Sequence, residues 1–209
     1  MSEFEEGGLD SLVGWFKTNQ KLVSIVLGGL TVVAIGVVVW QKSADTKIEN
    51  AERAFFAAQT ATAANPANAT TELAKVATRY AGTSAGDRAA LLSAQALMTQ
   101  GKTPEAMKQL TALVSNGGTD RLGATLQTLL AAGYENLNEP AAAAKAYLTA
   151  ASTSFGTAKI QRQADAARAY MAAGNTTEAL KLWTQLAKDE KSPLAAEAHV
   201  RLGELAVKQ

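Results

Sequence analysis

The sequence contains no cysteine, one histidine, four prolines and few aromatic residues. The absence of cysteine excludes disulfides and thiolate metal sites. The single imidazole, that of His199, excludes zinc sites built from several histidines. Alanine-rich, proline-poor sequence favours helices that pack closely. Proline costs little at a helix boundary, and we place all four prolines at or near one: Pro66, Pro104, Pro140 and Pro193. These features predict an all-α fold.

The chain also has no block of charge of one sign. Its net charge is +1, and residues 44–209 hold 17 basic and 15 acidic residues, a difference of +2, interspersed along the sequence. Nucleic-acid binding requires a concentrated basic face. We therefore expect no nucleic-acid partner.

Motifs for catalysis are missing as well. The carboxylates are scattered without a paired motif, and Gly117-Gly118 lacks the following Lys-Ser/Thr of a phosphate-binding loop. His199 lies among Ala198, Val200 and Leu202, which favours a surface or packing role over that of a base. We expect no enzyme activity, cofactor, metal or small-molecule substrate.

One long apolar segment is present. Residues 22–41 carry no charge and lie between Lys21 and Lys42. As a helix, about 20 residues span about 30 Å, the thickness of a membrane's hydrocarbon core. Trp40 stands where an interfacial aromatic residue would anchor the helix. A cleaved signal peptide would be shorter and end in a small-x-small site, whereas this run ends in Val39-Trp40-Gln41. The segment predicts one transmembrane helix, followed by a second domain at 44–209.

Residues 1–21 form a short tail with an amphipathic stub. Leu9, Leu12, Val13 and Phe16 follow the i, i+3, i+4, i+7 spacing of one helix face. This helix either lies on the membrane surface or leads into the transmembrane helix. The basic residues on the two sides of the apolar segment are nearly equal in number, so charge alone leaves the orientation open.

Residues 44–209 repeat with a period of 36–37 residues. Small and bulky residues recur at fixed positions of each unit, as expected for stacked pairs of antiparallel helices that bury their apolar faces against the next pair. The four columns are Ala94, Ala131, Ala167 and Gly203; Leu97, Tyr134, Tyr170 and Ala206; Ala106, Ala143 and Ala179; and Leu110, Tyr147 and Trp183.

The turn signals between these columns predict nine helices. Their ranges are 44–64, 69–80, 87–100, 104–115, 121–137, 140–152, 157–173, 177–189 and 193–207. The last helix is the first half of a unit without its partner. It carries Arg201 and Glu204 and is followed by Lys208, and we interpret it as a solubilising cap.

The columns resemble the tetratricopeptide repeat, whose unit has about 34 residues. The resemblance is clear over 86–191 and weaker over 44–82. The longer period and the missing tryptophan and leucine near each unit start depart from that family. The resemblance implies an α-solenoid that binds other proteins.

The whole layout resembles the YfgM-type ancillary subunits of the bacterial Sec translocon. An acidic tail (Glu3, Glu5, Glu6, Asp10) precedes the segment from Trp15 to Lys21, one apolar helix and the repeats. The resemblance implies a single-pass inner-membrane protein with a cytoplasmic N-terminus and periplasmic repeats. Implied partners are translocon subunits, periplasmic chaperones or emerging polypeptide segments. The alternative is a structural scaffold subunit of another envelope membrane complex.

In repeats of this kind the first helix of each pair lines a concave groove. A groove of Met, Gln, Thr and Arg side chains suits a peptide or a partner helix. Met98 and Met171 have a second interpretation, as fillers of the core. The predicted groove residues are Arg88, Leu91, Gln95, Met98, Thr99, Thr128, Glu135, Asn136, Arg168 and Met171, together with Thr125, Ala132, Gln161 and Ala164.

Overall fold

The computed structural model describes residues 14–15, 17–65 and 68–207, and every regular element in these ranges is a helix. The acidic tail and the stub residues Leu9, Leu12, Val13 and Phe16 lie outside the described residues. The chain divides into two compact units, residues 1–49 and 50–209. The helices are α2 (Gln20–Ala64), α3 (Ala69–Arg79), α4 (Ser84–Thr99), α5 (Thr103–Ser115), α6 (Gly118–Leu122), α7 (Ala124–Asn136), α8 (Pro140–Ser152), α9 (Gly156–Ala172), α10 (Thr176–Ala187) and α11 (Ala195–Val207).

In the first unit, the apolar side chains of α2 face outward. Ile25 is 73% exposed and Trp40 is 71% exposed, although aliphatic and aromatic side chains normally occupy a core. Among the described residues, α2 is the one helix long and apolar enough to cross a membrane, by length and composition. The transmembrane assignment of 22–41 stays a prediction.

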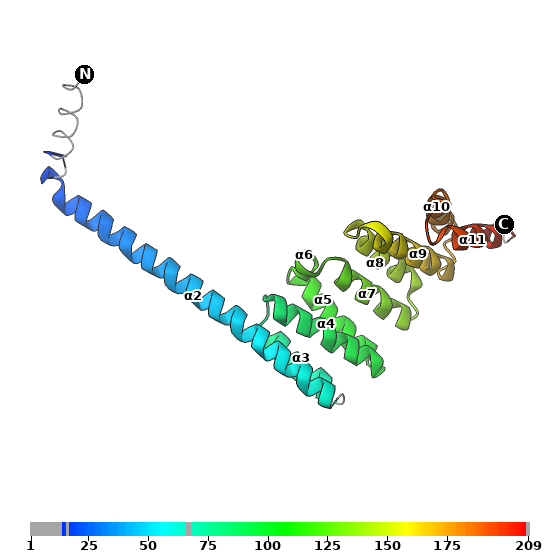
Figure 1. Cartoon of the computed structure of the whole chain (residues 1–209), viewed down its shortest axis with the longest axis horizontal. Helices are drawn as coiled ribbons and strands as arrows, with labels where there is room; N and C mark the ends of the chain where they lie inside the picture. Colours follow the sequence, from blue (N-terminus) through cyan, green and yellow to red (C-terminus); the bar gives the residue numbers. More distant parts are fainter. Residues whose placement is uncertain (1–13, 16, 66–67, 208–209) are drawn as a thin grey trace, which may run out of the picture. The chain divides into compact units, whose positions relative to one another are not determined.

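The second unit is a row of antiparallel helix pairs (Figure 1). The end of α2 and α3 form the first pair, followed by α4/α5, α7/α8 and α9/α10, with α11 closing the row. The first pair and α4 share one core cluster that includes Phe55, Leu73 and Val76. A second cluster runs without a break from Leu91 of α4 to Leu205 of α11. The apolar core therefore extends along the row as two clusters that both include residues of α4.

The repeat columns supply much of the core of this unit, and only their members on α11, Gly203 and Ala206, are exposed. Ala94, Ala131 and Ala167 are 0% exposed, and so are Ala106, Ala143 and Ala179. Their lack of bulk lets the helix backbones approach, and the bulky column Leu110, Tyr147 and Trp183 fills the remaining space. The columns extend back into the first pair, because buried Ala58 lies 36 residues before Ala94 and buried Leu73 lies 37 before Leu110.

Three turns of the same kind separate the helices of these pairs. Gly101, Asn138 and Gly174 have φ of 75°, 59° and 72°, the left-handed region that ends a helix. In each turn the next residue donates its backbone N–H to a carbonyl five residues earlier, from Lys102, Glu139 and Asn175 to Leu97, Tyr134 and Tyr170, over 2.8–2.9 Å. This is the Schellman arrangement, and its period explains the Gly, Asn, Gly pattern at these positions.

The predicted single helix 121–137 is wrong, because the chain turns at Gly123. This glycine has φ 52° and ψ −128°, which only glycine adopts at little cost. The residues before it form α6, whose Arg121 makes an ion pair with the buried Asp87 and donates to the carbonyl of Asn116 at 3.2 Å. The hydrogen bond with Asp87 raises the pKa of Arg121. The ion pair thus joins the short helix α6 to α4.

Two predicted helix starts are also corrected. The helix predicted from Asp87 begins at Ser84, because Thr83 caps it by accepting a hydrogen bond from the Gly86 N–H at 3.1 Å. The helix predicted from Pro193 begins at Ala195. The remaining predicted helices after residue 64 end within two residues of the observed ones.

A bidentate ion pair joins α9, the first helix of the last pair, to α11, the helix that closes the row. Arg168 donates from Nε and Nη2 to the two carboxylate oxygens of Glu197, at 2.8 and 2.6 Å. Arg168 also donates to Asp165 at 2.6 Å. The hydrogen bond from Arg168 lowers the pKa of Glu197, so this carboxylate stays ionised below the usual range.

Candidate protein-binding groove

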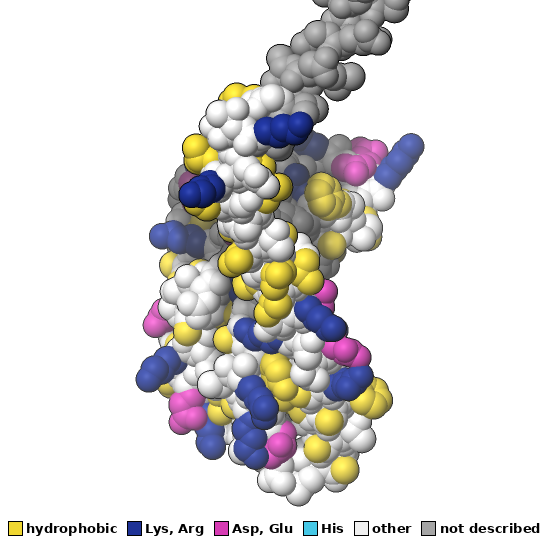
Figure 2. Space-filling view, turned by 90° about the vertical axis from the view of Figure 1, so that its left-hand side faces the viewer, with side chains coloured by type: hydrophobic (Ala, Val, Ile, Leu, Met, Phe, Trp, Pro, Cys, Tyr) yellow, Lys and Arg dark blue, Asp and Glu magenta, His cyan; other side chains and the backbone are white. Residues whose placement is uncertain are grey.

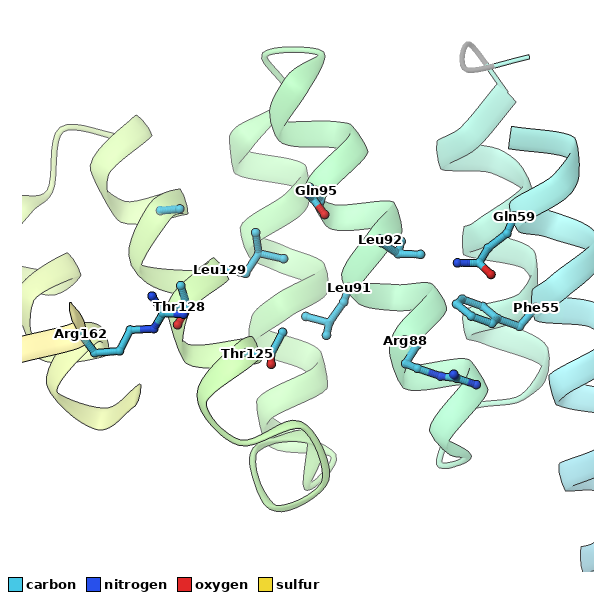
Figure 3. A pocket seen from close by; sticks show the side chains of 11 residues that line it. Phe55, Gln59, Arg88, Leu91, Leu92, Gln95, Thr125, Thr128, Leu129 and Arg162 are labelled. Carbon is cyan, nitrogen blue, oxygen red and sulfur yellow. The ribbon is translucent and has the colours of Figure 1, made fainter. Parts of the chain in front are cut away.

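The first helices of successive pairs line an open pocket of about 530 Å³, named here the inner groove (Figure 3). A second pocket of about 390 Å³ adjoins it and shares Gln59, Leu92 and Gln95. The inner groove is lined by Phe55 and Gln59 of α2, Arg88, Leu91, Leu92 and Gln95 of α4, Thr125, Thr128, Leu129 and Ala132 of α7, and Arg162 of α9.

The register of the repeat brings these side chains together. The four α4 positions and the four α7 positions differ by 37 residues in every case, and Phe55 and Gln59 precede Leu91 and Gln95 by 36. Positions i, i+3, i+4 and i+7 form one face of a helix. One face of α4 and the equivalent face of α7 therefore open into the groove, while the small column beside each face packs on neighbouring helices.

The inner groove carries two basic side chains with mainly uncharged apolar side chains between them. Figure 3 shows Arg162 at one end of the lining and Arg88 beside Phe55 toward the other end, with Leu91 and Leu129 between the two arginines. The Arg88 guanidinium lies 4.6 Å from the centroid of the Phe55 ring and makes an ion pair with Glu52. No Asp or Glu lines the pocket among the residues that the structure describes.

Several predicted groove residues gather in this pocket. Arg88, Leu91, Gln95 and Thr128 line the inner groove, together with Thr125 and Ala132. Thr99 lines the adjoining pocket. Asn136 is exposed near the end of α7, away from either lining.

The other predicted residues make contacts of a different kind. Met98 and Met171 pack against the core, and Met171 Sδ accepts the Trp183 indole N–H at 3.2 Å. Glu135 accepts a hydrogen bond from the Tyr147 hydroxyl at 3.0 Å. Burial, with the nearby Glu135 charge, raises the pKa of Tyr147. Arg168 is engaged by Glu197 and Asp165. Ala164 is buried, and Gln161 donates to Asp165 at 3.0 Å.

Sequence reasoning missed five lining residues: Phe55, Gln59, Leu92, Leu129 and Arg162. Extension of the period into the first pair would have found Phe55 and Gln59, because they align with Leu91 and Gln95. Leu92 and Leu129 have the properties of core residues, and only the packing shows that they reach the groove.

The surface carries charges of both signs. The face shown in Figure 2 carries Lys and Arg side chains as well as Asp and Glu side chains. Across the described ranges, no group of three or more His, Cys, Asp or Glu side chains could hold a metal ion. His199 is exposed on α11.

Stacked helix pairs with an inner groove are the architecture of a helical-repeat protein, a class whose concave surfaces typically bind other proteins. The chain belongs to the family described as tetratricopeptide repeat-like domain, which matches residues 14–207. This fold is typically a scaffold for protein interaction.

Two solved structures share the fold. Both are of the nearly identical TPR-like repeats of a Podosopora anserina protein described as a kinesin light chain. One is 21% identical with a TM-score of 0.55, and the other is 20% identical with a TM-score of 0.56. Each match covers 77% of this chain and 84% of the other. No curated protein matches the chain.

Proposed function

We propose that the protein is a membrane-anchored adaptor of the bacterial inner membrane whose repeats bind other proteins in the periplasm. Its layout resembles the YfgM-type subunits, which favours a role as an accessory subunit of the Sec translocon. In that role the repeats link the translocon to periplasmic chaperones or to emerging chains. The observation that carries the proposal is the combination of an apolar helix with a repeat domain that has an open inner groove.

The exposed apolar surface of α2 supports the anchor. None of the residues in its most apolar stretch is buried within the structure. Burial of apolar surface is worth about 25 cal/mol per Å², so a run of this length is unfavourable in water. A lipid bilayer removes that cost, and its hydrocarbon core is about as thick as the helical segment is long.

The inner groove supports the adaptor role. Its volume of about 530 Å³ is available to the side chains of a partner segment, as a groove that receives a peptide or a helix requires. Apolar side chains with a few polar groups around them are the usual composition of a surface that receives a partner segment.

The first test is the membrane topology. The native chain has no cysteine, so a single cysteine replaces Ser115, an exposed residue at the end of α5, without background. Thr18→Cys, exposed on the other side of the apolar segment, is the matched control. In intact cells with a permeabilised outer membrane, a thiol reagent that cannot cross the inner membrane should label Ser115→Cys and spare Thr18→Cys. The reverse pattern would place the repeats in the cytoplasm and overturn the proposal.

The second test is the identity of the complex. A photocrosslinking residue at Gln95, which is exposed and lines the inner groove, should capture translocon subunits, chaperones or translocating chains. The same residue at Lys145, exposed on α8, should not. A stable complex with unrelated envelope proteins would instead favour a structural scaffold.

A further inference from the structure

The two arginines of the inner groove are only partly satisfied. Arg88 bonds Glu52, and Arg162 lies 3.7 Å from Asp165, which is itself bonded by Arg168 and Gln161. Among the described residues, the Nε atoms of Arg88 and Arg162 are buried and have no hydrogen-bond partner. A buried unsatisfied donor is costly. These Nε atoms are closed to solvent, but the side chains of Arg88 and Arg162 are 42% and 29% exposed. Both arginines line the pocket, so a ligand that enters it can reach their outer guanidinium N–H groups and supply acceptors there.

Between the arginines the groove offers no charge to a ligand. Leu91, Leu92 and Leu129 present apolar surface, and Thr125 and Thr128 add small side chains. A hydrophilic anion would leave this surface exposed to water, and a purely apolar segment would offer no acceptor to the remaining N–H groups of the two arginines. The lining therefore matches a ligand that is acidic at both ends and apolar in the middle.

We propose that the inner groove binds a segment of a partner protein in which two acidic side chains flank bulky apolar side chains. One carboxylate bonds Arg88 and the other bonds Arg162, across the face of α7 that carries Thr125, Thr128 and Leu129. The apolar side chains cover this face and Leu91. This inference rests on the proposed function only in that the groove is a partner-binding site, and it does not depend on the side of the membrane.

The experiment is a selection of displayed random peptides on the full chain in lipid nanodiscs. Synthetic fluorescent copies of the enriched peptides are then titrated by anisotropy. Charge-assisted hydrogen bonds to Arg are strong, so the enriched peptides should carry Asp or Glu on both sides of apolar residues. Removal of both guanidiniums in Arg88→Gln/Arg162→Gln should weaken their binding about tenfold or more.

Two variants act as controls. Lys108→Gln/Lys145→Gln removes two exposed positive charges outside the groove and should leave the affinity unchanged. Gln95→Trp places a large side chain where an exposed glutamine lines both pockets and should block binding while both arginines remain. Circular dichroism of each variant shows whether it is folded, and Gln95→Trp keeps the test valid if the arginine variant unfolds.

Several results would overturn the inference. Enriched peptides without acidic residues, or equal affinity for the wild type and Arg88→Gln/Arg162→Gln, would leave only an apolar groove. Unchanged binding to Gln95→Trp would place the ligand elsewhere. A peptide of residues 1–10, which contains Glu3-Phe4-Glu5, is titrated too. Tighter binding of this peptide than of any selected one would make the chain's own tail the occupant.

The failure of this inference is separable from that of the proposed function. If no acidic peptide is selected while the labelled repeats lie in the periplasm and capture the translocon, only the inference fails. If Ser115→Cys is protected from the reagent while acidic peptides bind through Arg88 and Arg162, only the proposed function fails.

Discussion

The helices α9 and α11 occupy the same place in successive repeats, yet their equivalent residues have different environments. Ala164, Ala167 and Tyr170 of α9 are at most 7% exposed. Thirty-six residues later, Val200 is 61% exposed, and Gly203 and Ala206 are exposed. The helix α10 packs on both α9 and α11, but no helix follows α11 in the described chain. The comparison shows that a repeat position is buried only where another helix of the solenoid covers it. The type of residue at that position does not by itself place it in the core.

The largest expected effect comes from removal of the Trp183 side chain, the bulky core residue of α10. Trp183 of α10 is 0% exposed, and Trp183→Ala leaves a cavity beneath α9. We expect a loss of about 3–5 kcal/mol in the free energy of unfolding. The control Leu180→Ala, at a 36% exposed position of the same helix, should cost less than about 1 kcal/mol. Urea unfolding of the full chain in nanodiscs, followed by circular dichroism, measures both. Equal losses would contradict this account of the core.

A matched pair of substitutions tests the comparison directly. Ala167→Leu inserts bulk at a fully buried position and should destabilise the protein by about 1–3 kcal/mol. Gly203→Leu places the same side chain at the equivalent position of α11, where nothing lies within 4 Å of an added Cβ. Leucine has the higher helix propensity, so stability should stay equal or rise by up to about 1 kcal/mol. Thermal unfolding compares the two variants. A destabilising Gly203→Leu would mean that another element covers α11.

The ion pair between α9 and α11 should make stability depend on pH. The pKa of Glu197 is lowered by the hydrogen bond from Arg168, so its stabilising effect is present above the ordinary glutamate value of 4.5 and is lost as pH falls through the folded-state pKa. Glu197→Gln should cost about 1 kcal/mol near neutral pH, and the difference from wild type should shrink in acid.

Urea unfolding across this pH range tests the Glu197 prediction. Glu204→Gln is the control, because its pair with Arg201 is more exposed and belongs to one helix. The control should change stability by less than about 0.5 kcal/mol. A pH-independent effect of Glu197→Gln would rule out the carboxylate as the cause.

The smallest expected effect concerns the turn before α8. Asn138 adopts the left-handed conformation that glycine adopts in the turns at Gly101 and Gly174. Asn138→Gly removes the Cβ strain and should change stability by less than about 1 kcal/mol, in the stabilising direction. Gly174→Ala introduces the strain and should destabilise by about 1 kcal/mol. A fall in melting temperature for Asn138→Gly would show that the asparagine side chain stabilises the turn.

The groove could be predicted from the sequence only in part. Arg88, Leu91, Gln95 and Thr128 follow from the repeat register, because equivalent positions of first helices share a face. Met98, Met171 and Arg168 lie on the first helices too, but the two methionines contact the core and Arg168 contacts Glu197. A helix face is about 100° wide, and residue spacing does not tell whether a side chain at its edge points into the groove or into the core. From α7 to α9 the repeat column shifts by 36 residues, so the equivalent of Thr125 is Gln161, and Arg162 lies one residue further along the chain. Only the packed helices show that Arg162 reaches the groove.

The sequence by itself determined the helices, the period, and the small and bulky columns of the core, because these depend on local propensity and on a pattern that every unit repeats. Glycine and asparagine at fixed intervals likewise set the turns. Tertiary structure alone decided the break at Gly123, the pairing of Arg121 with Asp87, and which of two equivalent faces is buried. These outcomes depend on contacts between residues far apart in the chain, which no local pattern encodes.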